Sequence, residues 1–342
     1  MKFSSGAVFA ALLWFFASVI SIPTVLAADA PKLKVGLILD KGGRDDKSFN
    51  AAAYKGATDA EKKFGIALKV VESSDDSSVE PSLRTFAQRG FDLVIGIGFV
   101  MGDPMKKVSA EFPKIKFLLV DSEVKAANVR SVVFKEHEGS FLVGAIAALT
   151  STTKGVGFIG GMDIPLIRRF ELGYKSGAKY INPSVKFISN FVGSGSDAWR
   201  NPMKGKELAM SQYNQGVDVV FAAAGASGLG VFDAAEEKKK FVIGVDSNQN
   251  WVKPGRVLTS MVKRIDNAVF ETVEQTIKGK FEAGIFSKGL ADGGIDFAVD
   301  ANNRAVLTPA VEKKANEIKA QILSKKIKVP DFYELKPTVP TK

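Results

Sequence analysis

Short apolar runs alternate with longer helical patterns along most of the chain, and the alternation begins again near its middle. The first series of apolar runs includes LKVGLIL (33–39), FDLVIGIG (91–98) and KIKFLLVD (114–121). The second series includes GVGFIGG (155–161), VDVVFAAAG (217–225) and KFVIGVDS (240–247). Fully apolar strands separated by helices form parallel sheets whose two faces are both covered. The pattern therefore predicts an α/β protein with two parallel-sheet, Rossmann-like lobes of similar size.

Two further segments follow the second series after its sheet is already complete. They are the helical pattern DNAVFETVEQTIKG (266–279) and the later GGIDFAVD (293–300). We expect the chain to return to the first lobe and then cross again to the second, which would put several hinge strands side by side between the lobes, with a cleft between them. The predicted boundaries are 1–27 for a signal peptide, 28–135 with 265–293 for the N-terminal lobe, 136–264 with 294–330 for the C-terminal lobe, and 331–342 for a tail.

The start of the chain has the pattern of a secretory signal peptide. Lys2 precedes an apolar run from Ala7 to Ile20, and the small residues of TVLAADAPK suggest cleavage after Ala27. An uncleaved membrane anchor is the alternative, but the run is shorter than the roughly 20 apolar residues that a spanning helix needs. The sequence contains no Cys, which excludes disulfides and a lipid on an N-terminal cysteine. We expect a freely diffusing, monomeric periplasmic protein that is not lipid-anchored.

Composition argues against several classes of function. The formal net charge is +10, but the densest lysine runs, 236–240 and 324–328, fall at predicted helix ends. Cations are favourable there, so we interpret these runs as solvated surface and expect no nucleic-acid partner. His137 is the only His, there is no Cys, and no G-x-S-x-G motif occurs. The common nucleophilic hydrolases and Cys/His metal sites are therefore poorly supported, and we expect no cofactor and no metal.

The stretch DDKSFNAAAYKG (45–56) crowds polar side chains at a predicted helix start. Asp46 and Asn50 are four residues apart, a spacing that places two side chains on one face of a helix. They follow the apolar run 33–39, and ligands bind beyond the carboxyl ends of the strands in open parallel sheets. One interpretation is that both residues contact a small polar ligand. The alternative is that Asp45 or Asp46 caps the helix while Ser48 and Asn50 are exposed.

Two more carboxylates follow predicted strands, one in each lobe. Asp121 ends KIKFLLVD and Asp246 ends KFVIGVD. A carboxylate can accept charge-assisted hydrogen bonds from two neighbouring hydroxyl groups of a sugar. Either residue alone would more simply be a turn-forming Asp, but one from each lobe at the same cleft favours a ligand. Lys263, after LTSMV, is expected on a hinge strand near Asp246, and a surface position is its alternative.

These motifs together resemble the BMP family of substrate-binding proteins, the basic membrane protein or purine nucleoside receptor group of ABC importers. The resemblance rests on DKSFN, EGSFLVGAIAAL, GMDIPLIRRFELGYKSGAKYINP, GSGSDAWRNPMKGKELA and VIGVDSNQ with the later LTSMVK, in order over nearly the whole mature chain. It implies the two-lobed periplasmic binding protein fold of the ribose-binding type with three hinge strands. It also implies a purine nucleoside as ligand, a permease of the ABC type in the inner membrane as partner, and contacts of Asp46 and Asn50 with the base.

A purine ligand would need flat apolar faces and close backbone approach. The candidates for the flat faces are Tyr54, Phe170 and Trp199, because stacking on a base contributes roughly 1–3 kcal/mol in single-strand binders. Phe170 is preferred because Arg168 and Arg169 beside it suggest a polar turn that faces a loop. Gly225 and Gly228, in AAAGASGLG, would let the backbone approach the ligand, and a strand-to-helix turn is their alternative.

Three other classes of function are compatible with parts of this sequence. A binding protein for a free sugar or an autoinducer could have the same fold. A nucleoside hydrolase could use Asp46, Asp121 and Asp246 as acid and base. An adhesin or envelope structural protein would explain the basic surface but not the residues of the cleft.

Overall fold

The computed structural model describes residues 1–3 and 32–335. The predicted signal peptide, apart from its first three residues, and the end of the predicted tail lie outside the described residues. The fold belongs to the compact unit that begins at Leu33. Among the residues described, no helix combines the length and apolar character that crossing a bilayer requires.

Within residues 32–335 the strands form two six-stranded sheets. The first sheet has the order β11-β5-β4-β3-β1-β2, and its paired strands are parallel. Leu37 packs on one face of this sheet and Ile38 on the other, each inside a separate apolar cluster. Burial on both faces explains why the strands read as apolar runs. The strands are β1 (Lys34–Leu39), β2 (Ala67–Glu72), β3 (Leu93–Ile97), β4 (Lys116–Val120), β5 (Val129–Phe134) and β11 (Gly284–Lys288).

The second sheet has the order β12-β10-β9-β8-β6-β7. Its strands pair in parallel except β12, which runs antiparallel to β10 at the edge. The glycines of GVGFIGG lie inside β6, as its apolar run predicted. The strands are β6 (Gly155–Met162), β7 (Lys186–Gly193), β8 (Val219–Ala223), β9 (Phe241–Asp246), β10 (Val257–Lys263) and β12 (Ile295–Phe297).

Helices cover both sheets, and each sheet with its helices forms one lobe. Helices α4 and α5 make the most extensive helix contact, because Gly173 and Gly177 lack a Cβ that would collide with the carbonyl oxygens of His137 and Phe141. The helices are α1 (Phe49–Phe64), α2 (Val79–Gln88), α3 (Gly102–Glu111), α4 (Glu136–Thr150), α5 (Pro165–Ile181), α6 (Pro202–Asn214), α7 (Gly228–Lys238), α8 (Ile265–Ile277) and α9 (Pro309–Leu323).

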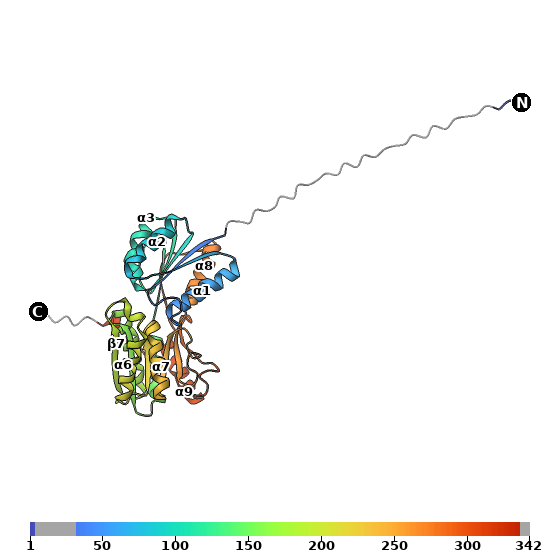
Figure 1. Cartoon of the computed structure of the whole chain (residues 1–342). Helices are drawn as coiled ribbons and strands as arrows, with labels where there is room; N and C mark the ends of the chain where they lie inside the picture. Colours follow the sequence, from blue (N-terminus) through green and yellow to red (C-terminus); the bar gives the residue numbers. More distant parts are fainter. Residues whose placement is uncertain (4–31, 336–342) are drawn as a thin grey trace. The chain divides into compact units, whose positions relative to one another are not determined.

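The chain passes between the two sheets three times. It leaves the first sheet after β5, returns after β10, and crosses again between β11 and β12. Helix α8 follows a strand of the second sheet but lies beside α1 of the first lobe (Figure 1). The predicted fold class, two parallel-sheet lobes, is confirmed, and the three passages lie where hinge strands were predicted. The short strand β11 was not predicted.

Candidate functional site

A cavity lies where the carboxyl ends of strands from both sheets meet. It contains about 530 Å³ of space outside the atoms, the part open to solvent included. A site of this size at the carboxyl ends of parallel strands is where open α/β sheets bind ligands. Its walls are formed by Asp40, Gly42, Asp46, Phe49, Asn50, Gly98, Phe99, Asp121, Leu166, Ile167, Phe170, Trp199, Ala223, Gly225, Val245, Asp246 and Lys263.

Asp46 is the capping group of α1, as the alternative interpretation of this stretch had it. Its carboxylate accepts from the backbone N–H groups of Ser48 (2.8 Å), Asn50 (2.9 Å) and Ala51 (3.0 Å). Asp46 precedes the helix, so it does not share a helical face with Asn50 in the expected way. Both side chains are nevertheless buried and line the cavity. Asp46 therefore both caps helix α1 and lines the cavity.

Asn50 is oriented by a second carboxylate that the sequence reasoning missed. Its Nδ2 donates to Asp40 (2.7 Å) and Asp46 (3.0 Å), and its Oδ1 accepts from the Asp40 N–H (3.1 Å). Asp40 follows β1 directly, so the rule that site residues follow strands could have found it. Burial raises the pKa of Asp40 to about 6, although the Asn50 amide opposes the shift.

Asp121 and Asp246 stand at equivalent places in the two sheets. Asp121 follows β4 and Asp246 ends β9, and both have left-handed backbone, with φ of 65° and 63°. Non-glycine residues rarely adopt this conformation, and such strain gathers at functional sites. Asp246 accepts from the Ser48 hydroxyl at 2.7 Å. Asp121 accepts from Lys263 at 2.5 Å, while its other oxygen, Oδ1, is buried without a hydrogen-bond partner within residues 32–335.

Lys263 ends β10 and is buried rather than at the surface. Its ammonium contacts Asp121 and, at 3.3 Å, Glu136, and it lies 5.1, 5.2 and 5.6 Å from the ring centres of Phe49, Phe134 and Phe170. Burial by itself would lower the pKa of Lys263, but Asp121 and Glu136 together raise it above the ordinary value. Asp246, which was expected beside Lys263, also raises the pKa of Lys263. Within residues 32–335 it forms no hydrogen bond or ion pair with the ammonium.

One wall of the cavity is apolar. Phe170 is buried in α5 and presents its ring both to the cavity and to the Lys263 ammonium. Trp199 ends a 3₁₀ turn (Ser196–Trp199), and its ring fits against Gly161, where any Cβ would collide with it. Gly225 has φ of 55° and lies against Trp199. Flat aromatic faces and a neighbouring glycine give this wall the shape that a planar ring would need.

Two of the predicted residues do not line the cavity. Tyr54 lies one turn further along α1, half-buried, with the guanidinium of Arg44 5.2 Å from its ring centre. Gly228 begins α7, and a Cβ there would contact Ala222 rather than the cavity. The other eight predicted residues all line this cavity.

The site carries an excess of negative charge. Its walls include four aspartates but, among the described residues, a single basic side chain, Lys263. Burial raises the pKa of Asp46 and of Asp246 to about 6, and neighbouring carboxylates add to both shifts. Carboxylates in low dielectric repel anions and accept strongly from hydroxyl and N–H donors. Such a site suits a neutral ligand rich in donors. No group of three or more His, Cys, Asp or Glu suited to a metal ion occurs in the described ranges.

The two lobes touch each other directly through side chains close in sequence to residues that line the cavity. The Ser48 hydroxyl donates to Asp246 (2.7 Å) and also lies 3.1 Å from the Val245 carbonyl, and the Ser247 hydroxyl donates to the Ser48 carbonyl (2.8 Å). Lys41 pairs with Asp197 at 2.5 Å, and the Ser196 hydroxyl donates to Asp76 at 2.6 Å. These contacts connect the first lobe to the second.

A match over most of the chain identifies its family. The family model Bmp, described as ABC transporter substrate-binding protein PnrA-like, matches residues 32–332. The chain belongs to the Bmp family. The ABC transporter nucleoside-binding protein BmpA of Lactococcus lactis subsp. cremoris is 35% identical over 321 residues, which cover 87% of this chain and 89% of the relative.

Solved structures agree with this placement. An ABC transporter solute-binding protein from Aeropyrum pernix K1 superposes with a TM-score of 0.80 at 28% identity, over 87% of this chain and 94% of the other. The arabinose-binding protein AraP from Geobacillus stearothermophilus has a TM-score of 0.61 at 15% identity, over 81% and 100%, and shares the fold alone. The predicted BMP resemblance is confirmed. This Bmp protein is thus a substrate-binding protein of an ABC transporter, a class that works with a membrane permease.

Proposed function

We propose that this protein binds a purine nucleoside in the cavity and presents it to an ABC permease in the inner membrane. It acts in the periplasm as a monomer, after removal of its signal peptide, without a lipid anchor and without catalysing a reaction. The observation that carries the proposal is the combination of aspartates from both lobes with an aromatic wall around one cavity. The name of the Lactococcus lactis relative as a nucleoside-binding protein supports it.

Each part of a nucleoside has a suitable partner in this arrangement. The sugar hydroxyls donate to Asp121 and Asp246, whose carboxylates lie at the ends of β4 and β9. The base stacks between Phe170 and Trp199, and its polar edge faces Asn50. A phosphate group would add negative charge beside four aspartates, so nucleotides are excluded by repulsion. Charge and shape therefore favour the neutral nucleoside over its phosphate ester.

Closure of the lobes follows from contacts that only the closed form offers. A ligand held by Asp121 of the first lobe and Asp246 of the second gains both interactions only when the cleft is shut. Binding shifts the population toward the closed form by the difference in affinity between the two states. The permease can then distinguish the closed, ligand-bound protein from the open, ligand-free protein by its conformation.

A fluorescence titration tests the ligand. The mature chain has two tryptophans, Trp199 at the cavity and Trp251, which is 54% exposed and outside it. The Trp251→Phe variant leaves Trp199 as the reporter, and we expect its emission to change on titration with adenosine, guanosine or inosine. Ribose and AMP should bind at least about tenfold more weakly. Equal or tighter binding of ribose would favour a sugar receptor instead.

Two further measurements test the absence of catalysis and the location. Chromatography after incubation with inosine should return the intact nucleoside, whereas release of free hypoxanthine would identify a carboxylate-dependent hydrolase. The intact mass of the exported protein should correspond to a chain that begins at Ala28 and carries no lipid. A larger mass or recovery in the membrane fraction would contradict that part of the proposal.

A further inference from the structure

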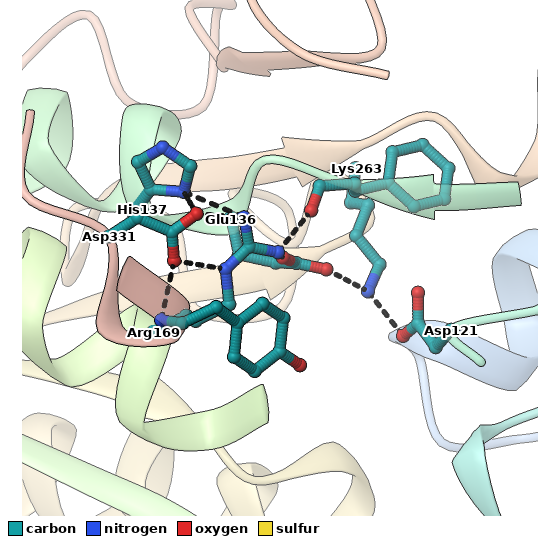
Figure 2. A network of polar contacts seen from close by, with 8 residues as sticks. Asp121, Glu136, His137, Arg169, Lys263 and Asp331 are labelled. Carbon is teal, nitrogen blue, oxygen red and sulfur yellow. Dashed lines mark hydrogen bonds and ion pairs between the residues drawn. The ribbon is translucent and has the colours of Figure 1, made fainter. Parts of the chain in front are cut away.

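A chain of alternating charges leads from the cavity to the C-terminal segment of the protein. Asp331 pairs with Arg169 through two 2.7 Å hydrogen bonds, and Arg169 donates to Glu136 at 2.6 Å. Glu136 contacts Lys263, and Lys263 contacts Asp121 at the cavity wall. Figure 2 shows these contacts as one continuous network. The five side chains come from segments far apart in the sequence, so their alignment is a property of the fold.

Most of this network is removed from water. Lys263, Glu136 and Arg169 are buried, with side-chain exposures of 1%, 1% and 7%. The sequence suggested that Arg169 marks a polar turn, and this was wrong, because the side chain is buried. Phe170 beside it does line the cavity. In a buried network of this kind, removing one charged side chain leaves its neighbour as an uncompensated buried charge. A change at one end of the network is thus transmitted to the next member.

The cavity end of the network bears on ligand binding directly. Lys263 holds one oxygen of Asp121, and the buried Oδ1 of the same carboxylate has no partner in the range 32–335. Asp121 also has a left-handed backbone, which surrounding contacts must maintain. The Lys263 contact therefore fixes the direction in which the free oxygen points.

The outer end is secured by the C-terminal segment. Asp331 precedes a 3₁₀ turn (Phe332–Glu334), and the ring centre of Tyr333 lies 4.4 Å from the Arg169 guanidinium. Arg169 also donates to the Phe134 carbonyl at 2.6 Å, at the end of the strand where the chain first leaves the first sheet. The segment thus fixes Arg169 beside a hinge connection.

We propose that Arg169, Glu136 and Asp331 are positioning residues for ligand binding, which act through Lys263 to orient the Asp121 carboxylate. The inference rests on the proposed function in one respect, namely that a ligand hydroxyl donates to Asp121. It assigns a role in recognition to the C-terminal segment, which does not line the cavity.

The charges around Glu136 determine how the network responds to pH. Burial raises the pKa of Glu136 to about 7, Asp121 adds to this, and Lys263 and Arg169 oppose it. His137 on the same helix faces Arg169, and burial lowers its pKa to about 4, so it is neutral at pH 7. The remaining groups at the outer end are Asp331 and the Tyr333 phenol, whose pKa burial raises to about 12. Loss of Arg169 should therefore raise the pKa of Glu136 further and leave Lys263 with Asp121 as its one charged partner.

The test compares three variants with a matched control. We expect Arg169→Met to weaken inosine binding at pH 7 by about tenfold, Asp331→Asn by a smaller factor, and Arg169→Lys to restore part of the loss. The pH below which affinity declines should move upward in Arg169→Met. Glu334→Gln, in the same segment but in an exposed pair with Lys328, should bind as the wild type does. Wild-type affinity and pH profile in Arg169→Met would overturn the inference.

A ligand-free measurement separates this inference from the proposed function. The side-chain carboxyl of Glu136, assigned with Glu136→Gln, is titrated by ¹³C NMR in the wild type and in Arg169→Met. An upward shift of its midpoint in the variant supports the network even if no nucleoside binds to the wild type, in which case the proposed function alone fails. An unchanged midpoint refutes the network whatever the ligand.

Discussion

Replacement of Lys263 by Met tests whether one buried cation holds the site together. The ammonium balances Asp121 and Glu136 and lies against three phenylalanine rings. Removing one partner of a buried ion pair is destabilising by about 3–5 kcal/mol, because the remaining charges stay buried. We expect Lys263→Met to lose stability in this range at pH 7.5, measured by urea unfolding.

The pH dependence gives the sharper result. Glu136 has a folded pKa of about 7, raised above its unfolded value, so its burial lowers wild-type stability progressively up to about pH 7 and no further. Without Lys263 this pKa rises, and the variant should keep losing stability above pH 7, by about 1.4 kcal/mol per pH unit relative to the wild type. Parallel stability curves between pH 7 and 8 would refute the reasoning. Lys253→Met, which breaks exposed pairs with Asp233 and Glu236, is the control and should lose less than about 1 kcal/mol without this trend.

Three other changes have defined outcomes. Asp246→Asn removes a charged acceptor and should weaken nucleoside binding by about 1.5–3 kcal/mol in calorimetry, and a loss below threefold would contradict its role. Gly161→Ala places a methyl group against the ring of Trp199 and should shift its emission and reduce affinity, whereas Gly195→Ala, which meets nothing within 4 Å, should be neutral. Lowering the pH from 7 to 5 should weaken binding, because Asp46 and Asp246 take up protons near pH 6. The ligand-free protein should gain stability over the same interval, since folded pKa values above the unfolded ones favour the protonated native state, and opposite trends in calorimetry or urea unfolding would refute this.

The sequence predicted the fold well because buried parallel strands are apolar along their whole length. Runs such as LVIGI in β3 and VVFAA in β8 carry that signal locally. Strand β11 was missed because GIFSK is short, lies at a sheet edge and is only partly buried, so it lacks the apolar pattern. Strand β11 forms by pairing with β5, which lies far away in the sequence, so the residues of β11 alone do not indicate this pairing.

The site was predictable where a simple rule applied. Asp121 and Asp246 were found because each follows an apolar run, and Asp40 satisfies the same rule after β1. Glu136 and Arg169 carry no comparable signal, because their contacts depend on packing between α4, α5 and the end of β10. A charged residue that begins or interrupts an apolar helix is the closest hint in the sequence.

The three passages between the sheets have a consequence for how the protein is made. The first sheet is not complete until β11, at residues 284–288, has joined β5, and α1 is not covered until α8 has been delivered. A chain that emerges N-terminus first must therefore keep an open sheet edge until nearly all of it has been synthesised. The first lobe therefore cannot reach its final structure before residues 284–288 are available, however early its first five strands are made.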